Sequence, residues 1–384
     1  MRGKRWLAAF LAALCVGMPC LLPASAASSL AEENVKAPAA VLMEAESGKV
    51  LYEKAPHEKR ACASVTKVMT LLLVMEALES GKLTWTETLT ASAHAASMGG
   101  SDIWLEEGEQ MTVEDLVKAT VVASANDAAV VLAEAVAGSE EAFVQQMNAR
   151  AKELGMQDTT FKNCNGLDEE GHLTSAYDVA LMSRALLSHK EILNYTTIWM
   201  DTLRGGKTQL VNTNKLLRSY DAITGLKTGT TSQAGSCISA TAQRGDLSLI
   251  AVVLGASTTQ DRFSTARALL DYGFDNWSME PLPQPETPLT AVKVRGGMQP
   301  EVAVSADLSG SMLVPKEEAG KAVCTVELQT GVEAPVQKGQ QLGQVLYTLG
   351  EETLCTRPIL AQQSVEAQSL LRIFSLLLQK VFSI

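Results

Sequence analysis

The stretch SVTKVMTLLLVMEALES, residues 64–80, begins with two reactive side chains and continues as an almost unbroken apolar run. Apolar residues fall on every side of a helix drawn through it, which predicts a helix buried at the centre of a domain. Ser64 and Lys67 are three residues apart and share one face of that helix. Lysine is rarely buried without a reason. Either a desolvated Lys67 activates the serine, or Ser64 caps the helix and the Lys67 amine reaches solvent.

Strand-like segments flank the helical region in the sequence. Residues 64–187 have mostly helical spacing, with Thr112 and Ser175 at positions typical of helix caps. Outside them the pattern predicts two hairpins and a further helix, at residues 39–43 with 50–53, 237–242 with 247–254, and 261–274. We therefore expect an α/β (α+β) domain over residues 39–280, in which distant parts of the chain form one antiparallel sheet covered by helices.

The C-terminal third has a different pattern. Residues 281–288, PLPQPETP, contain four prolines and predict a stiff linker. Short alternating segments in residues 289–360 then predict a small all-β domain. Residues 361–384 end in a two-sided pattern that predicts an amphipathic helix lying in a membrane interface. The alternative is a helix packed on its own domain.

The N-terminus has the features of an export signal. Residues 1–26 contain a basic head, an apolar centre and the small-residue exit Ala24-Ser25-Ala26, which predicts a cleaved signal peptide. Residues 27–38 are expected to be a disordered leader. Cleavage after Ala26 leaves 29 basic and 43 acidic residues, a net charge of −14. That balance argues against a nucleic-acid partner.

Cysteine and histidine usage points away from metal chemistry. The five cysteines after Ala26 are widely spaced with no CxxC pair, which favours isolated packing cysteines over a disulfide framework, although one bridge is possible. The four histidines form no HExxH or HxxxH pair. We therefore expect no metal and no organic cofactor.

Three short motifs occur in a fixed order. Ser64-x-x-Lys67 stands at a helix start, Ser124-Ala125-Asn126 at a loop between helices, and Lys227-Thr228-Gly229 on a predicted strand. Each alone is common and has a structural explanation as a helix cap or a strand-edge charge. Their order and placement together are specific to penicillin-recognising serine enzymes.

From about residue 38 to the C-terminus the chain resembles the serine-type D-Ala-D-Ala carboxypeptidases, which are low-molecular-mass penicillin-binding proteins. Besides the three motifs, the resemblance includes VASANDAAVVLAE, NGLDEEGHLTSAYDVA and TGLKTGTTSQAGSCISATA. It implies a transpeptidase-like domain shared with serine β-lactamases, peptidoglycan stem peptides as substrate and β-lactams as covalent inhibitors. It also implies an exported enzyme on the outer face of the bacterial cytoplasmic membrane.

The resemblance implies catalytic roles for four residues. Ser64 is expected to attack the carbonyl between two terminal D-alanines, with Lys67 as the base that removes its proton. Burial in an apolar helix is expected to lower the Lys67 pKa. Ser124 is expected to relay the proton to the leaving D-alanine, and Asn126 to hold the substrate amide.

Five further residues are expected to bind substrate. Lys227 would supply positive charge near the terminal carboxylate, Thr228 a hydrogen bond, and Arg262 additional charge. Gly229 would let the substrate backbone lie close to the strand. The backbone N–H groups of Thr230 and Ser64 would bind the oxyanion.

Two other functions share some of these features. A β-lactamase has the same three motifs but needs a second base, often in an E-x-x-L-N loop, and no such motif occurs here. A catalytically silent wall-binding protein would not require Ser64 and Lys67. His172 and Asp178 permit a Ser-His-Asp triad, yet we assign them to loop and helix-start positions because Ser64 already has Lys67.

Overall fold

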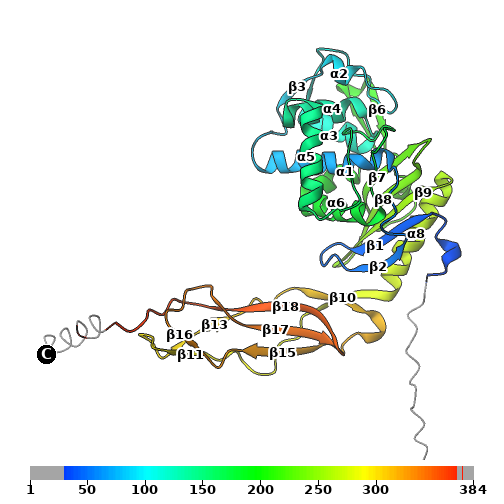
Figure 1. Ribbon diagram of the computed structural model, residues 1–384. Helices are drawn as coiled ribbons and strands as arrows, with labels where there is room; N and C mark the ends of the chain where they lie inside the picture. The colour runs from blue at the N-terminus through cyan, green and yellow to red at the C-terminus, as the bar shows by residue number, and fades with distance from the viewer. Residues whose placement is uncertain (1–29, 370–373, 375–384) are drawn as a thin grey trace, which may run out of the picture.

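The computed structural model describes residues 30–369 and residue 374. A five-stranded antiparallel sheet organises the N-terminal domain (Figure 1). Its strands, in spatial order, are β2 (Val50–Lys54), β1 (Ala39–Glu44), β9 (Leu247–Ala256), β8 (Gly235–Arg244) and β7 (Ile223–Thr231). The N-terminal hairpin thus pairs with the last strand of the domain, as the sequence predicted.

The sheet separates two apolar cores. Alternate residues of β1 face opposite sides: Ala39, Val41 and Met43 pack with the helical region, whereas Ala40 and Leu42 pack with a single helix on the other face. Because both faces are covered, the strands read as continuous apolar runs rather than alternating ones. That single helix is α8 (Thr259–Asn276), which packs against β8 and β9.

The central helix of the helical region begins differently from the prediction. A 3-10 turn, η2 (Ala63–Thr66), carries Ser64, and α1 (Lys67–Glu79) continues from it. Every residue of α1 from Lys67 to Met75 is buried, which confirms the predicted buried helix. Ser64 is not the N-cap of α1. The N-cap position belongs to Thr66, which has helical backbone angles and whose side chain accepts no capping hydrogen bond.

The helices around α1 start where polar residues can cap them. Thr112, Ser139 and Ser175 each accept a hydrogen bond from the backbone N–H three residues later. The elements of this helical region are α2 (Ala93–Ala96), α3 (Val113–Val122), α4 (Asn126–Ala137), α5 (Glu140–Glu153), α6 (Ala176–Ser188), α7 (Leu193–Thr196), η3 (Lys190–Ile192), η4 (Arg204–Gly206) and η5 (Lys215–Arg218). Two small two-stranded sheets that the sequence did not reveal complete it: β3 (Thr88–Thr90) with β4 (Gln110–Thr112), and β5 (Met200–Leu203) with β6 (Thr208–Val211).

The segment expected to be a disordered leader is ordered where the structure describes it. Residues 30–38 contain a 3-10 turn, η1 (Glu32–Asn34), followed by the buried side chains of Val35 and Ala37. These two side chains join the core beneath α8, and the Lys36 N–H donates to Thr265 Oγ1 at 3.1 Å. Apolar contact with α8 therefore corrects that prediction. The predicted signal peptide lies outside the described residues.

The C-terminal domain is all β with a core of its own, as expected. Its elements are β10 (Trp277–Pro281), β11 (Val292–Arg295), β12 (Glu301–Val302), β13 (Val304–Ser305), β14 (Ser311–Pro315), η6 (Lys316–Glu318), β15 (Val323–Leu328), β16 (Gly331–Glu333), β17 (Gln341–Leu349) and β18 (Glu352–Ala361). Strand β10 follows α8 directly and pairs with β14, so Pro281, the first residue of the predicted linker, belongs to a strand. Leu282 is also buried.

The predicted C-terminal amphipathic helix does not begin at residue 361. Ala361 ends β18, and Val365 and Ala367 form β-bridges with Val336 and Gly297. These extended residues lie at the end of the β domain remote from the N-terminal domain (Figure 1). Apart from residue 374, the rest of the predicted helix, 370–384, falls outside the described residues. Within the described part of the chain, no helix has the length and apolarity needed to cross a bilayer.

Candidate active site

Two neighbouring segments hold the turn that carries Ser64. Gly229 of β7 packs so closely on it that an added Cβ would lie 2.7 Å from the Cys62 carbonyl oxygen and 2.8 Å from the Ser64 nitrogen. On another side, a Cβ on Gly166 would lie 2.0 Å from the Ala63 carbonyl oxygen. Ala63 itself has a φ of +51°, an uncommon value for a residue with a side chain. Only glycine permits this packing, so both contacts fix the Ser64 backbone.

Lys67 is completely buried beside the serine. Its Nζ donates to Ser64 Oγ at 3.0 Å, to Asn126 Oδ1 at 2.5 Å and to the Asn165 carbonyl at 2.7 Å. Burial lowers the pKa of this amine to about 7, against the opposing influence of Cys164, Asp102 and Asp127. A substantial fraction of Lys67 is therefore neutral near neutral pH, as a general base requires.

The Ser124-Ala125-Asn126 motif forms the turn between α3 and α4. Ser124 is buried and has a φ of +64°, so it occupies a strained backbone conformation. Asn126 begins α4, where its Oδ1 accepts from Lys67 and its Nδ2 donates to the Gly99 carbonyl at 2.6 Å. Both ends of the Asn126 amide are thus bonded to the protein. The sequence predicts a contact with the substrate amide, and the structure adds a contact of Asn126 with Lys67.

The Lys227-Thr228-Gly229 motif lies on β7, an edge strand of the sheet. Lys227 is buried, and its Nζ donates to the Thr228 carbonyl at 3.0 Å. Thr228 Oγ1 donates to Thr213 Oγ1 at 2.6 Å. Desolvation, with repulsion from Lys67 and Arg262, lowers the Lys227 pKa well below its ordinary value. An anion bound beside Lys227 and Arg262 would relieve the repulsion between them.

Arg262 joins the end of β7 to α8. It is buried, and its Nη1 donates to the Gly229 carbonyl at 3.1 Å and to Thr230 Oγ1 at 3.0 Å. Thr230, by contrast, is exposed on the edge strand. The structure therefore brings Arg262 to the same strand end as Thr230, about 30 positions away in the sequence.

Residues 163–168, for which the sequence predicted no role, also contact the site. The Asn165 carbonyl accepts from Lys67, and Asp168 Oδ1 accepts from Thr231 Oγ1 at 2.6 Å. This loop therefore links the Lys67 side to the β7–β8 turn. Its Asn165-Gly166 pair is a turn signal that marks a loop. The contact of the Asn165 carbonyl with Lys67, however, could not be predicted from the sequence, because every residue has a backbone carbonyl.

His172 and Asp178 are engaged elsewhere. The His172 ring contacts Thr66 Oγ1 at 2.8 Å and accepts from the Lys162 N–H at 3.2 Å, and burial lowers its pKa to about 4. Asp178 lies in the first turn of α6 and accepts from Thr159 Oγ1. The structure thus agrees with the expected loop position of His172 and the expected helix-start position of Asp178. Among the described residues, no three His, Cys, Asp or Glu side chains are grouped to hold a metal ion.

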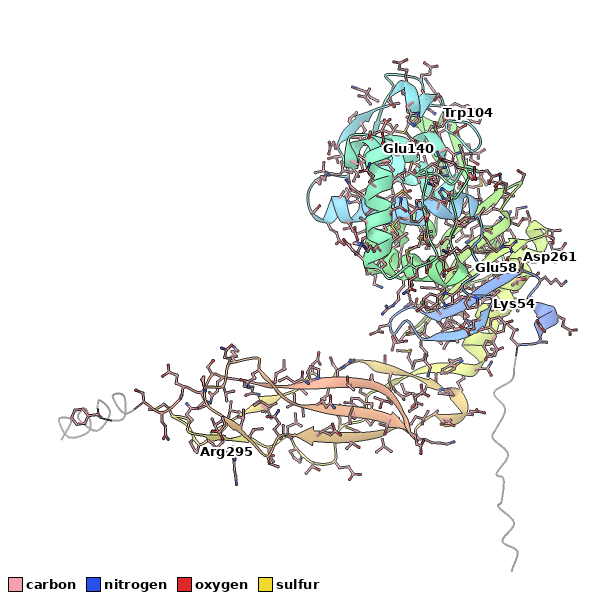
Figure 2. All side chains as sticks on the ribbon, viewed as in Figure 1. Lys54, Glu58, Trp104, Glu140, Asp261 and Arg295 are labelled. Atoms are coloured by element: carbon pink, nitrogen blue, oxygen red, sulfur yellow. The ribbon has the colours of Figure 1, made fainter. Side chains whose placement is uncertain are left out.

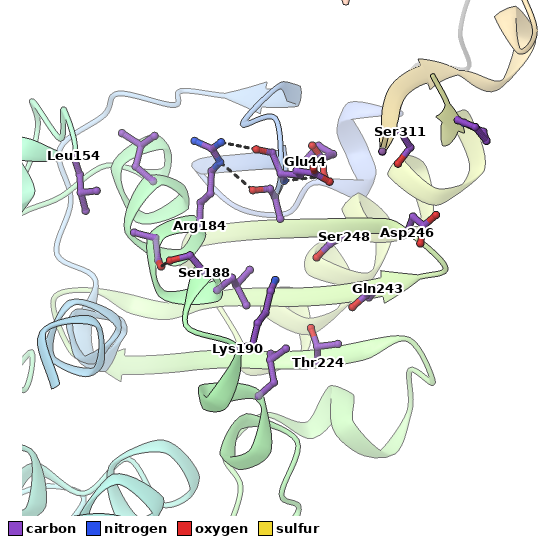
Figure 3. A pocket seen from close by; sticks show the side chains of 18 residues that line it. Glu44, Leu154, Arg184, Ser188, Lys190, Thr224, Gln243, Asp246, Ser248 and Ser311 are labelled. Carbon is purple, nitrogen blue, oxygen red and sulfur yellow. Dashed lines mark hydrogen bonds between the residues drawn. The ribbon is translucent and has the colours of Figure 1, made fainter. Parts of the chain in front are cut away.

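A large cavity of about 1040 Å³ lies between α6 and the β domain (Figure 3). It is at the ends of the sheet strands that are farther from the Ser64 cluster. Its lining includes Glu44, Arg184, Lys190 and Thr224 but none of the predicted site residues. Arg184 Nε donates to the Ala45 carbonyl, and Glu44 accepts from the Ser47 hydroxyl. Because none of the three motifs lines it, the cavity is separate from the Ser64 cluster.

Comparison with known proteins agrees with this geometry. Residues 25–258 match the family described as D-alanyl-D-alanine carboxypeptidase, and residues 277–367 match the C-terminal domain of penicillin-binding protein 5. The chain belongs to the D-alanyl-D-alanine carboxypeptidase family. The second match starts at β10, where the β domain begins in the structure.

Individual members of this family are similar over most of their length. D-alanyl-D-alanine carboxypeptidase DacF of Bacillus subtilis is 43% identical over 343 residues, covering 88% of this chain and 87% of that protein. The crystal structure of penicillin-binding protein 5 from Haemophilus influenzae superposes with a TM-score of 0.77 at 29% identity, over 86% of this chain and 98% of that one. Penicillin-binding protein D2 of Listeria monocytogenes, solved in an ampicillin-bound form, is 36% identical with a TM-score of 0.55, over 62% and 98%.

Proposed function

We propose that this protein is a D-alanyl-D-alanine carboxypeptidase that removes the terminal D-alanine from peptidoglycan stem pentapeptides through a Ser64 acyl-enzyme. The observation that carries the proposal is the buried Lys67 amine, 3.0 Å from Ser64 Oγ and with a pKa lowered to about 7. Family membership supplies the substrate class.

In the first step the neutral Lys67 amine accepts the Ser64 proton. Protonated Lys67 uses its three hydrogens on Ser64 Oγ, Asn126 Oδ1 and the Asn165 carbonyl. In the neutral amine, the two remaining hydrogens stay with the Asn126 and Asn165 oxygens, which directs the lone pair at the Ser64 hydroxyl. Asn126 and Asn165 therefore act as positioning groups for the base.

Ser64 Oγ then bonds to the carbonyl carbon of the penultimate D-alanine, and the bond to the leaving amine breaks. We assign the oxyanion to the backbone N–H groups of Ser64 and Thr230. The close contact between the Ser64 turn and Gly229, the residue before Thr230, supports this assignment. The Lys67 proton passes to the leaving amine by way of Ser124. Water then attacks the ester carbonyl while Lys67 again accepts a proton. The bond from the acyl carbon to Ser64 Oγ breaks, and Lys67 returns that proton to Ser64 Oγ.

The terminal carboxylate is proposed to bind at Lys227, Thr228 and Arg262. A carboxylate there offsets the mutual repulsion of the cations and raises the depressed Lys227 pKa. The rest of the stem is proposed to lie along β7, which is the last strand of its sheet.

Intact-mass measurement tests the proposal. Incubation with penicillin should add one penicillin mass, located on Ser64, and incubation with a D-Ala-D-Ala peptide should release D-alanine. The Ser64→Ala variant should do neither. Release of D-alanine by a correctly folded Ser64→Ala protein would refute the acyl-enzyme. Rapid turnover of penicillin would instead identify a β-lactamase.

We also propose that the protein is exported through its N-terminal signal and held on the outer face of the cytoplasmic membrane by the C-terminal segment. In residues 370–384, Arg372, Ser375, Gln379 and Ser383 recur at helical spacing among large apolar residues. Truncation after Ser369 should move the mature protein from the membrane fraction to the soluble one. A truncated protein that still sediments with membranes would contradict this anchor.

A further inference from the structure

We propose that Trp104 is a stacking platform for a sugar ring of the peptidoglycan glycan strand, next to the Ser64 cluster. The inference rests on the carboxypeptidase function proposed above. It concerns the part of the substrate that lies far from the bond that is cleaved.

The Trp104 side chain is 78% exposed, the largest exposed fraction among the large apolar side chains that the structure describes. Tryptophan is highly buried on average, so such exposure is informative. Figure 2 shows Trp104 at the surface of the helical region, on the side of that region where β6 and β7 lie in Figure 1. The indole is thus available to a ligand.

The backbone of Trp104 is held rigidly on both sides. Its φ of +54° is an outlier for a bulky residue. The Asp127 carboxylate accepts from the backbone N–H groups of Ile103 and Leu105, at 3.1 Å and 3.0 Å to Oδ2. Strained conformations persist only where the surroundings enforce them, and they gather at ligand sites.

Arg204 fixes the carbonyl groups of Ile103 and Trp104. Its Nη1 donates to the Ile103 carbonyl at 2.9 Å, and its Nη2 to the Trp104 carbonyl at 3.4 Å. The Arg204 guanidinium is itself oriented by Glu109, at 2.6 Å and 3.0 Å. The backbone is therefore immobilised while the indole projects outward, and such an aromatic loses little entropy on binding.

The loop that carries Trp104 is joined directly to the catalytic cluster. The Asn126 N–H donates to the Ser101 carbonyl at 2.6 Å, and Asn126 Nδ2 donates to the Gly99 carbonyl at 2.6 Å. Asn126 in turn contacts Lys67. Covalent geometry along this path, through Asp127, places the Trp104 carbonyl carbon at most about 18 Å from the Lys67 amine.

This upper limit is compatible with the length of the substrate. Four residues of an extended stem separate the scissile bond from the sugar that carries the stem, a span of about 14 Å. A stem with its D-Ala-D-Ala end at Ser64 can therefore bring its sugar to Trp104. A pyranose has an apolar C–H face and polar edges, which match a flat, exposed indole, whereas the peptide backbone finds its hydrogen-bond partners along β7.

The test compares two substrates that differ only in the sugar: a free stem pentapeptide and the same stem attached to its disaccharide. We expect Trp104→Ala to lower the ratio of kcat/KM for the disaccharide-linked stem over the free stem by about five- to tenfold. Trp104→Phe should retain most of this ratio because it keeps an aromatic face. Covalent labelling by penicillin shows that each variant has an assembled Ser64 site.

Val323→Ala is the matched control, since Val323 is an exposed apolar residue of the C-terminal domain, 57% exposed. It should leave the ratio at the wild-type value. An unchanged ratio in Trp104→Ala, or an equal loss on both substrates, overturns the assignment, the second result pointing to a peptide contact. If the wild-type protein releases no D-alanine from either substrate, the proposed function fails and the inference fails with it.

Discussion

The two domains differ sharply in what they bury. In the described residues, the buried charged side chains all lie between Glu44 and Thr265, as do the buried Ser, Thr, Asn and His side chains, whereas the buried polar atom of the C-terminal core is the Tyr347 hydroxyl. The non-glycine residues with positive φ, such as Ala63, Trp104 and Ser124, also lie in the N-terminal domain. Burying polar groups and straining the backbone both cost stability. The N-terminal domain carries most of these costs, several of them around Ser64, whereas the C-terminal core is almost entirely apolar.

The largest effect is expected from Ser64→Ala, because the nucleophile has no substitute among its neighbours. Covalent penicillin labelling and D-alanine release should both disappear, while the melting temperature changes little. Intact-mass spectrometry and calorimetry measure the two properties. Labelling at another residue would show that the buried polar cluster is not the reaction centre.

Lys67→Ala should come next. Loss of a general base typically costs about 10²–10⁴-fold in rate, so acylation by penicillin should slow by that amount. Removing a buried cation also removes its desolvation cost, so the variant should remain folded. Stopped-flow acylation gives the rate. A variant that acylates as fast as the wild-type protein would exclude Lys67 as the base.

The pH dependence of the acylation rate should follow the ionisation of Lys67. The Lys67 pKa is lowered to about 7, and only the neutral amine accepts a proton. The acylation rate should therefore fall about tenfold per pH unit below 7 and level off above it. Measurement between pH 5 and 9 gives the apparent pKa. A flat profile over this range would contradict a titrating base.

Gly229→Ala should have an intermediate effect. The new Cβ would lie within 3 Å of backbone atoms of Cys62, Ser64 and Val65, none of which can move away cheaply. We expect β7 to shift from the Ser64 turn, with acylation slowed and stability lowered by about 1–3 kcal/mol. Denaturant unfolding and labelling kinetics measure both. Wild-type behaviour would show that the close contact is not required.

The smallest effect on activity is expected in the C-terminal domain. Ile359 is fully buried in its core, and Ile359→Ala should destabilise that domain by about 2–5 kcal/mol. Because Ile359 touches no part of the Ser64 cluster, kcat/KM on a soluble peptide should stay at the wild-type value. A large loss of activity would show that the two domains are not specialised as described.

The sequence predicted the parts of the site that local geometry fixes. The three-residue spacing of Ser64 and Lys67 puts them on one helical face, and that pair lies 3.0 Å apart. The expected strand position of the Lys227-Thr228-Gly229 motif is likewise confirmed, since the motif lies on β7. In these cases a short segment contains all the information that the structure uses.

Long-range contacts could not be predicted in this way. The Asn165 carbonyl reaches Lys67 across 98 positions, and a carbonyl is common to every residue. Val35 and Ala37 looked like part of a polar leader because the apolar surface that buries them comes from α8. The close approach of Gly229 to the Ser64 turn is also tertiary, so the glycine alone suggested only a contact with substrate.

The most direct test of the account is the ionisation of Lys67 itself. In protein labelled with ¹³C at lysine Cε, an NMR titration should show a lysine with a pKa near 7 whose signal is missing from Lys67→Met. Lys227→Met identifies the second lysine whose pKa is lowered. If the signal that Lys67→Met removes titrates near 10, as an ordinary lysine does, the amine beside Ser64 is charged at neutral pH and cannot take its proton.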